Sequence, residues 1–199
     1  SVGGTGKTPM VEYLVSFLKK KHQVATLSRG YGRDSKGFII ADLQATSQDI
    51  GDEPLQLFNK FKDITVAVDA DRQNGLNLLK KSKPSIDVVL LDDAFQHRKV
   101  SAGFNILLTA YDQLYCHDYV LPTGNLREPK SGAKRAQAIV VTKSPEGLSH
   151  EHKSSIIEQL NPEPNQEVFF SSIQYSDVLM SLTSRHSVTD LKAVRFTLV

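Results

Sequence analysis

The segment GTGKT, residues 4–8, constrains the fold of this chain more than any other feature. It matches the end of the pattern G-x-x-x-x-G-K-[ST], a loop that joins a β-strand to a helix and turns backbone N–H groups toward phosphate oxygens. Pro9 and the apolar spacing up to residue 20 predict that a helix follows directly. The alternative is a glycine-rich turn before a helix, because the strict pattern asks for glycine where Ser1 stands.

Strand-like and helix-like segments alternate along the rest of the chain, which favours an α/β fold with a mostly parallel sheet and helices on both faces. The run IDVVLLDD, residues 86–93, is continuously apolar, as in a strand buried on both faces. Residues 115–136 are rich in Pro, Gly and basic residues and predict a long functional loop with a short helix. The other expected strands are 24–28, 38–40, 64–69, 104–110, 138–144, 167–173 and 193–199, and the expected helices are 9–20, 52–61, 71–82 and 150–160.

Composition narrows the functional classes only modestly. Of the 199 residues, 40% are hydrophobic and 23% are charged, as in ordinary globular domains. The net charge of +2 gives no bulk electrostatic reason to expect a nucleic-acid partner. A single cysteine, Cys116, excludes an internal disulfide framework. The sequence contains no run of about 18 apolar residues, the length that a membrane-spanning helix needs.

Two acidic residues end the apolar run, and they are the natural counterpart of the phosphate loop. In open α/β sheets ligands bind at the carboxyl edge of the strands, where Asp92 and Asp93 should lie. Lys7 would reach the β- and γ-phosphates of a nucleotide, and the hydroxyl of Thr8 would ligate Mg²⁺ together with these carboxylates. Two acids could also be an ordinary strand terminus, but beside GTGKT they predict a magnesium–phosphate site.

The motif GDEP, residues 51–54, supplies a candidate catalytic carboxylate. Acids in the first turn of a helix are commonly there because they favour its N–H dipole. A kinase also needs a carboxylate that accepts the proton of the attacking hydroxyl, and Asp52 is the candidate. His97, directly after the acidic pair, could face the site or simply pack at the end of a strand. Arginines in SRGYGR (28–33) and LREP (126–129) offer guanidinium groups that can bind phosphates or an anionic substrate.

Taken in order, GGTGKTP (3–9), SRGYGR, GDEP, DDAFQHR (92–98) and LREP resemble the tetraacyldisaccharide 4′-kinases, the lipid A 4′-kinases of bacteria. The resemblance covers about residues 1–145, and this family tolerates a residue other than glycine where Ser1 stands. Ala94 is a departure, because the family usually has glycine there. A methyl group is acceptable at that position unless the backbone needs a positive φ.

The resemblance implies a P-loop NTPase-like fold, truncated at both ends, and an ATP- and Mg²⁺-dependent reaction. The γ-phosphate of ATP would pass to the 4′-hydroxyl of a tetraacylated disaccharide 1-phosphate, a lipid-linked acceptor. It implies that Asp52, Lys7 and Asp93 are catalytic and that Thr8, Asp92 and Asp93 hold the metal. Arg72, His97 and Arg127 are lesser candidates for contact with the substrate. The residues expected to bind the nucleotide are Gly3, Gly4, Thr5, Gly6, Lys7 and Thr8.

The resemblance also implies an enzyme that works at a membrane surface, on the cytoplasmic face of the bacterial inner membrane, with its anchor outside this chain. Residues 1–145 would form the P-loop kinase core. Residues 146–199 would continue the α/β fold toward a further C-terminal part. The strand that should present the phosphate loop is expected before Ser1.

A second hypothesis is a P-loop ATPase or a GTPase-like switch or metallochaperone that acts by binding partners. A GTPase usually carries an [NT]KxD motif that reads guanine. VTKSP (141–145) begins in that way but has Pro145 where the aspartate should stand, which counts against guanine specificity.

Overall fold

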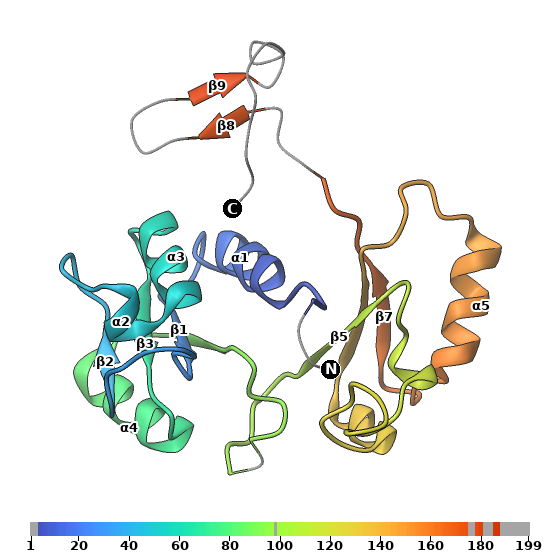
Figure 1. Cartoon of the computed structure of the whole chain (residues 1–199), viewed down its shortest axis with the longest axis horizontal. Helices are drawn as coiled ribbons and strands as arrows, with labels where there is room; N and C mark the ends of the chain where they lie inside the picture. Colours follow the sequence, from blue (N-terminus) through green and yellow to red (C-terminus); the bar gives the residue numbers. More distant parts are fainter. Residues whose placement is uncertain (1–3, 98, 175–177, 181–184, 188–199) are drawn as a thin grey trace.

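The computed structural model describes residues 4–97, 99–174, 178–180 and 185–187, and the predicted strand 193–199 lies outside them. Figure 1 shows two groups of strands side by side, with one helix between them. In chain order the helices and strands are α1 (Lys7–Leu18), β1 (Val24–Ser28), β2 (Ile39–Ile40), α2 (Ser47–Ile50), α3 (Asp52–Lys60), β3 (Thr65–Val68), α4 (Arg72–Ser82), β4 (Val88–Leu91), β5 (Ile106–Ala110), the 3₁₀ helices η1 (Tyr115–His117) and η2 (Lys130–Arg135), β6 (Ala138–Thr142), α5 (His150–Leu160), β7 (Glu167–Phe170), β8 (Val178–Met180) and β9 (Arg185–Ser187).

The first sheet has the strand order β2-β3-β1-β4. Strand β1 pairs in parallel with β3 and with β4, and only the two-residue β2 runs antiparallel, against β3. Parallel neighbours require crossover connections, and α3 and α4 stand on either side of β3 in the sequence. The mostly parallel sheet predicted from the alternation of strands and helices is therefore confirmed for this half of the molecule.

Helices cover both faces of the first sheet, because alternate side chains of a strand point to opposite faces. On one face Val24 of β1 packs in a cluster with Val15 of α1 and Leu57 of α3. On the other face Leu27 packs with Leu79 of α4. All five side chains are buried, so β1 is a core strand between two layers of helices.

The second sheet has the order β5-β6-β7, and all three strands are parallel. Ile139 and Val141 of β6 point to the same face and pack against Ile156 and Leu160 of α5. This sheet therefore has a hydrophobic core of its own, separate from the two clusters around β1. In the described part of the chain, no helix is long and apolar enough to cross a bilayer.

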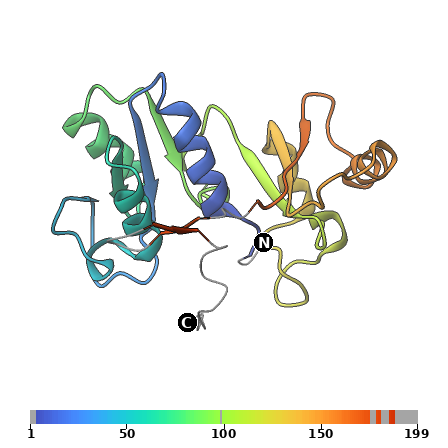
Figure 2. The ribbon, with the colours of Figure 1, turned by 90° about the horizontal axis from the view of Figure 1, so that it is seen from above.

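Strand β4 differs from its prediction. The run 86–93 was expected to be buried on both faces, yet the strand covers only Val88–Leu91 and each of its residues is half-buried. Four of the five residues of β1 and all five of β6 are buried. The reason is position: β4 is the edge of the first sheet, β5 is the edge of the second, and a cavity of about 1240 Å³ lies between them. Figure 2 shows α1 over this region.

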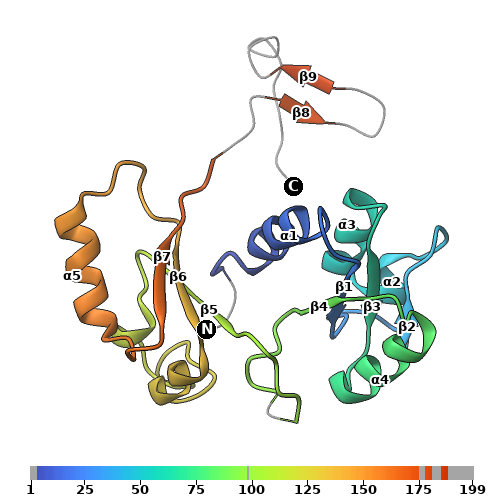
Figure 3. The ribbon, with the colours of Figure 1, turned by 180° about the vertical axis from the view of Figure 1, so that it is seen from behind.

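The long predicted loop, residues 115–136, forms η1, a turn-rich segment and η2. Asp118 closes it, because its carboxylate accepts hydrogen bonds from the main-chain N–H groups of Tyr119 and Asn125 at 2.7 and 3.0 Å. Leu126 is buried, which holds the following Arg127 beside the carboxyl ends of the strands. The segment 92–105 links β4 to β5 across the two sheets (Figure 3).

Candidate active site

The loop that precedes α1 has the backbone of an anion-binding loop. Gly4 and Gly6 have φ values of +73° and +79°, a region in which side chains with a Cβ are strained. Gly6 is the N-cap of α1, and no side chain caps this end of the helix. The first N–H groups of α1 are thus available to a bound anion, with the positive end of the helix dipole behind them. Gly3, also predicted to bind the nucleotide, lies outside the described residues.

The second sheet holds this loop in place. The Thr142 hydroxyl, at the end of β6, donates a hydrogen bond to the main-chain oxygen of Thr5 at 2.9 Å, and the Thr109 main-chain oxygen lies 3.3 Å from the same hydroxyl. All three residues are buried. Sequence analysis missed Thr142; its only signal was a hydroxyl at the end of a buried apolar strand.

Asp93 contacts two cationic side chains at the site. Its Oδ2 accepts a hydrogen bond from Nη1 of Arg127 at 2.7 Å, and its Oδ1 lies 3.7 Å from Nζ of Lys7. Three segments distant in sequence, the phosphate loop, the end of β4 and the LREP motif, therefore meet at one carboxylate. Asp93 also has a φ of +49° whereas Ala94 is absent from the described residues with positive φ, which explains how a methyl group is tolerated at Ala94.

The two adjacent aspartates have opposite pKa shifts. Burial raises the pKa of Asp92 above its ordinary value, and the negative charges of Glu53 and Asp93 raise it further. Burial also acts to raise the pKa of Asp93, but the hydrogen bond from Arg127 and the charge of Lys7 outweigh it and hold this pKa below its ordinary value. The positive charge of Lys7 acts in the opposite direction on Asp92 but does not outweigh these effects.

The structure brings Glu53, which the sequence analysis did not single out, to the phosphate loop. The Thr8 hydroxyl donates a hydrogen bond to Oε1 of Glu53 at 3.0 Å. Asp52, the predicted proton acceptor, is the exposed first residue of α3. Glu53 stands in the same first turn, so its charge also suits the helix dipole. The signal was present in GDEP, whose second acid was considered only as a capping residue.

Two glycines allow the SRGYGR and GDEP motifs to pack closely. A Cβ on Gly30 would lie 2.8 Å from the main-chain oxygen of Ile50, and a Cβ on Gly51 would lie 2.8 Å from that of Tyr31. Both glycines have positive φ, +68° and +90°. This contact fixes the start of α3, and with it Glu53, relative to the end of β1.

Arg72 lies near the aspartates and is 2% exposed. Its Nη1 donates to the main-chain oxygen of Asp69 at 2.7 Å, whereas its buried Nε has no hydrogen-bond partner among the described atoms. Burial, together with the charge of Arg29, holds the pKa of Arg72 below its ordinary value. His97 instead ends a turn in which its main-chain N–H donates to the main-chain oxygen of Ala94. It lines the large cavity between the sheets.

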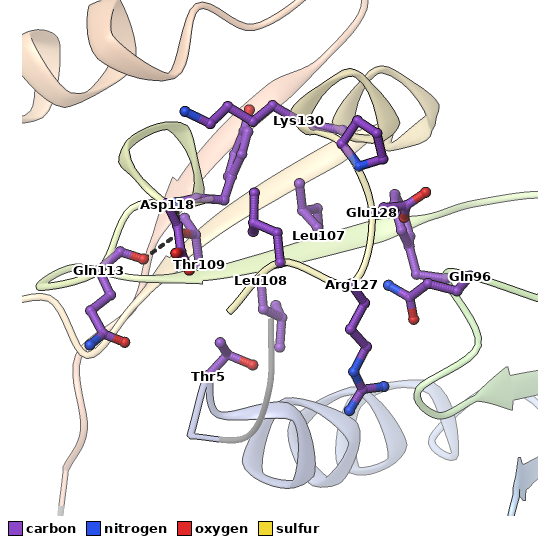
Figure 4. A pocket seen from close by; sticks show the side chains of 15 residues that line it. Thr5, Gln96, Leu107, Leu108, Thr109, Gln113, Asp118, Arg127, Glu128 and Lys130 are labelled. Atoms are coloured by element: carbon purple, nitrogen blue, oxygen red, sulfur yellow. Dashed lines mark hydrogen bonds between the residues drawn. The ribbon is translucent and has the colours of Figure 1, made fainter. Parts of the chain in front are cut away.

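A small pocket of about 50 Å³ opens beside the phosphate loop. Figure 4 shows Thr5 at one end of it and Lys130 at the other, with Arg127 between the pocket and α1. The Lys130 ammonium group donates to the main-chain oxygen of Cys116 at 2.6 Å. The pocket thus joins the phosphate loop to the basic segment that follows Leu126.

The donors at this site suit Mg²⁺. Thr8, Asp92 and Asp93 offer only oxygen atoms, and Mg²⁺ is commonly held by one or two carboxylates plus the phosphates of a substrate. Burial, together with the charges of Glu53 and Asp93, raises the pKa of Asp92, and a divalent cation beside this carboxyl group would favour its charged form. These three residues would hold the ion.

Comparisons with known proteins agree with this geometry. Residues 1–197 match the model of the LpxK family, described as tetraacyldisaccharide-1-P 4′-kinase. The tetraacyldisaccharide 4′-kinase of Flavobacterium johnsoniae is 50% identical over 193 residues, which are 97% of this chain and 57% of the relative. That of Flavobacterium psychrophilum is 52% identical over 194 residues, 96% of this chain and 57% of the relative. This chain therefore spans little more than half the length of these relatives.

A solved structure shows the same likeness in three dimensions. A crystal structure of LpxK from Aquifex aeolicus, described as an "apo" form in complex with ATP, superposes with a TM-score of 0.65 at 30% sequence identity. The match covers 88% of this chain and 69% of that chain. With the family model matched over nearly all of its residues, the chain belongs to the tetraacyldisaccharide-1-P 4′-kinase family.

Proposed function

We propose that the protein containing this chain transfers the γ-phosphoryl group of ATP to the 4′-hydroxyl of a tetraacyldisaccharide 1-phosphate. The new bond joins the phosphorus to the acceptor oxygen, the bond between the γ-phosphorus and the β–γ bridging oxygen breaks, and ADP leaves. The observation that carries the proposal is the convergence of Lys7 and Arg127 on Asp93, beside the anion-binding loop, in a chain of this family.

The residues of the site have distinct tasks in this reaction. The N–H groups of the loop and the ammonium group of Lys7 offset the charge of the phosphates, which is the main demand of phosphoryl transfer. Thr8, Asp92 and Asp93 would hold Mg²⁺, which would further neutralise the phosphate charge. The exposed carboxylate of Asp52 accepts the proton of the attacking hydroxyl.

Two arginines are suited to anionic groups of the substrates. Arg127 is bound to Asp93 in this structure and has its guanidinium group at the entrance to the small pocket (Figure 4). Arg72 has a buried Nε without a partner among the described atoms, and a buried donor gains free energy when it finds an acceptor. His97 lines the large cavity between the sheets and is the weaker candidate for substrate contact.

The acceptor also places the reaction at a membrane surface, because a tetraacylated disaccharide resides in a bilayer. We assign the cytoplasmic face of the inner membrane, where ATP is present. Vesicles containing the disaccharide lipid should sediment with the full-length protein. Recovery of the protein in the supernatant at every lipid concentration would contradict this assignment.

The test of the reaction is transfer of radiolabelled γ-phosphate to the disaccharide lipid by the full-length protein. Lys7→Ala and Asp52→Asn should each lower the rate by about 100-fold or more, the usual contribution of such groups. Asp52→Asn should leave the KM for ATP close to wild type, because it acts on the acceptor. Glu158→Gln, on the exposed face of α5, is the matched control and should have wild-type activity.

The outcomes separate the roles and the alternative function. Wild-type turnover in Lys7→Ala or in Asp52→Asn would reject the role given to that residue. Hydrolysis of ATP at equal rates with and without the lipid, with no label in the lipid, would instead indicate a P-loop ATPase that acts on partners.

A further inference from the structure

A guanidinium group joins the LREP motif to the segment that follows the acidic pair. Nη2 of Arg135, the last residue of η2, donates to both carboxylate oxygens of Glu128, at 2.8 and 2.9 Å. The same nitrogen donates to the main-chain oxygen of Phe95 at 3.1 Å. The guanidinium carbon lies 4.6 Å from the centroid of the Phe95 ring, within the range of a cation–π contact. Arg135 therefore binds two segments that are distant in sequence.

This contact lies beside the bond between Arg127 and Asp93. Glu128 directly follows Arg127, and Phe95 stands two residues after Asp93. Figure 4 shows the neighbouring side chains of Arg127 and Glu128 pointing in different directions. Arg127 contacts the carboxylate of Asp93, and Glu128 contacts Arg135. The same two segments are thus joined twice, once at Asp93 and once at Arg135.

The second sheet holds the backbone of Arg135 in place. Ala136, the next residue, is fully buried, and β6, which begins at Ala138, is buried along its whole length. Nε2 of Gln166, just before β7, donates to the main-chain oxygens of Ala133 and Ala136 at 2.8 and 2.7 Å. The chain on both sides of Arg135 is therefore fixed to a core sheet, whereas the LREP motif lies in a loop.

Gly132 shows how closely Glu128 is held. Gly132 is buried, and a Cβ on it would lie 2.7 Å from the carboxyl carbon of Glu128. Gly132 is not among the described residues with a positive φ, so its backbone does not require glycine. The carboxylate of Glu128 instead fills the space of a side chain. The side chain of Glu128 is only 16% exposed, so water screens its pair with Arg135 less than it screens a surface pair.

The link matters because Arg127 and Asp93 each have another partner in the proposed reaction. Arg127 is suited to an anionic group of the substrates, and Asp93 is a proposed ligand of Mg²⁺. Either partner competes with the bond between the two side chains. The groups that Arg135 binds are not among these proposed ligands, so its link persists when substrates bind. A misplacement of about 1 Å at a reacting centre can lower the rate about 100-fold.

We propose that Arg135 is a positioning residue, which keeps Arg127 beside the acidic pair when Arg127 exchanges Asp93 for an anionic group of the substrate. Arg135 acts through Arg127, because it ties the adjacent Glu128 to Phe95. Its effect on the rate rests on the proposed function. Its effect on the guanidinium group of Arg127 does not, because Arg127 contacts Asp93 in the structure as it stands.

The kinetic test is phosphate transfer by the full-length protein. Arg135→Gln should lower kcat by about tenfold or more, because Arg127 is misplaced. The KM for ATP should stay within about threefold of wild type, because the phosphate loop is unchanged. Lys134→Gln is the matched control: it removes the neighbouring, exposed ion pair with Glu163 and should have wild-type kinetics. A wild-type kcat in Arg135→Gln would overturn the proposal.

A double-mutant cycle separates positioning from general damage to the fold. If Arg135 acts through Arg127, adding Arg135→Gln to Arg127→Ala should lower kcat by less than about twofold further. Losses that add in full would show that Arg135 only supports the fold. Urea denaturation reports the stability of each variant. If Arg135→Gln is unstable, Arg135→Lys takes its place with the same expectation, because it keeps the charge but not the planar group that binds both partners.

A second measurement needs no reaction. In the full-length protein labelled with ¹⁵N-arginine, the Nε–H signal of Arg127 is identified by its loss in Arg127→Ala. Arg135→Gln should speed solvent exchange of this proton by about fivefold or more, because the guanidinium group is held less firmly, and Lys134→Gln should not. If the wild type transfers no label to the lipid, the proposed function fails and this exchange alone decides the role of Arg135. Unchanged exchange of the Arg127 proton would reject that role.

Discussion

Asp93 combines three properties that rarely occur together in one residue. It has a positive φ, it accepts a hydrogen bond from Arg127, and it lies 3.7 Å from the ammonium group of Lys7. Aspartate tolerates the left-handed region better than most residues, and strained backbone is often found at functional sites. Two cations therefore sit against a carboxylate that we propose as a metal ligand.

Thr8 gives the sharpest single-residue test of the proposed metal site. Thr8→Val keeps the shape of the side chain but removes the hydroxyl that donates to Glu53. The same hydroxyl is a proposed ligand of Mg²⁺, and interactions with charged groups contribute about 1.5–3 kcal/mol, so kcat/KM for Mg²⁺·ATP should fall by about tenfold or more. Steady-state kinetics at varied Mg²⁺ measures the effect. Thr8→Ser, which restores the hydroxyl, should remain within about threefold of wild type, and equal activity of the valine variant would remove Thr8 from the site.

At this scale, the motifs of the sequence indicated which segments meet but not which atoms touch. Lys7, Asp93 and Arg127 were named from their motifs, and the structure brings them together. Glu53 was missed because neighbouring residues of a helix point in directions about 100° apart, and sequence cannot tell which of two adjacent acids faces the loop. Here it is Glu53 that contacts Thr8.

Among the helices, α4 shows how close packing depends on a missing side chain. Gly75 is buried, and a Cβ on it would lie 2.9 Å from Cβ of Asp69 and 3.0 Å from the methyl groups of Leu27. Glycine inside a helix ordinarily costs about 1 kcal/mol relative to alanine. Here the gain in helix propensity from alanine is opposed by contact with β1 and with the end of β3.

Gly75→Ala should therefore lower the free energy of unfolding, by about 1–3 kcal/mol, the usual cost of overpacking a core. Denaturation with urea measures the change. Asn77→Ala, at an exposed position of the same helix, is the control and should stay within about 0.5 kcal/mol of wild type. If Gly75→Ala were more stable than wild type, the gain in helix propensity would outweigh the close contacts of the added methyl group.

Local pattern predicted some elements without error and missed others for identifiable reasons. Strand 24–28 and helix 150–160 have the predicted bounds, because apolar periodicity and a capping Ser149 define them locally. Helix α2 was missed because its four residues are too few to show a helical period, although Thr46 and Asp49 form a capping box at its start. The burial of β4 depends on its position at the edge of the first sheet. The apolar sequence of the strand does not indicate that position.

At the scale of the whole molecule, two sheets with separate cores share one loop. The link from the second sheet is the buried hydroxyl of Thr142, bonded to Thr5. The link from the first is α1, which follows the loop and packs on β1. The candidate site is therefore built where the two halves meet, as ligand sites in α/β proteins often are.

Thr142→Val should weaken ATP binding although Thr142 touches no phosphate-binding atom. The substitution leaves the buried oxygen of Thr5 without its donor, at a cost of about 1–3 kcal/mol, and releases the loop from β6. Titration calorimetry of the full-length protein should show ATP affinity reduced by about fivefold or more, with Thr142→Ser close to wild type. Unchanged affinity in the valine variant would mean that α1 alone fixes the loop.

The position of the phosphate loop between two cores has a consequence for heat stability. A ligand that binds only the native arrangement stabilises it by an amount that grows with the logarithm of the ligand concentration relative to its Kd. Because Thr5 is fixed by β6 while Lys7 begins the helix that packs on β1, a nucleotide seated there protects both halves at once. Nucleotide binding should therefore raise the melting temperatures of both halves together.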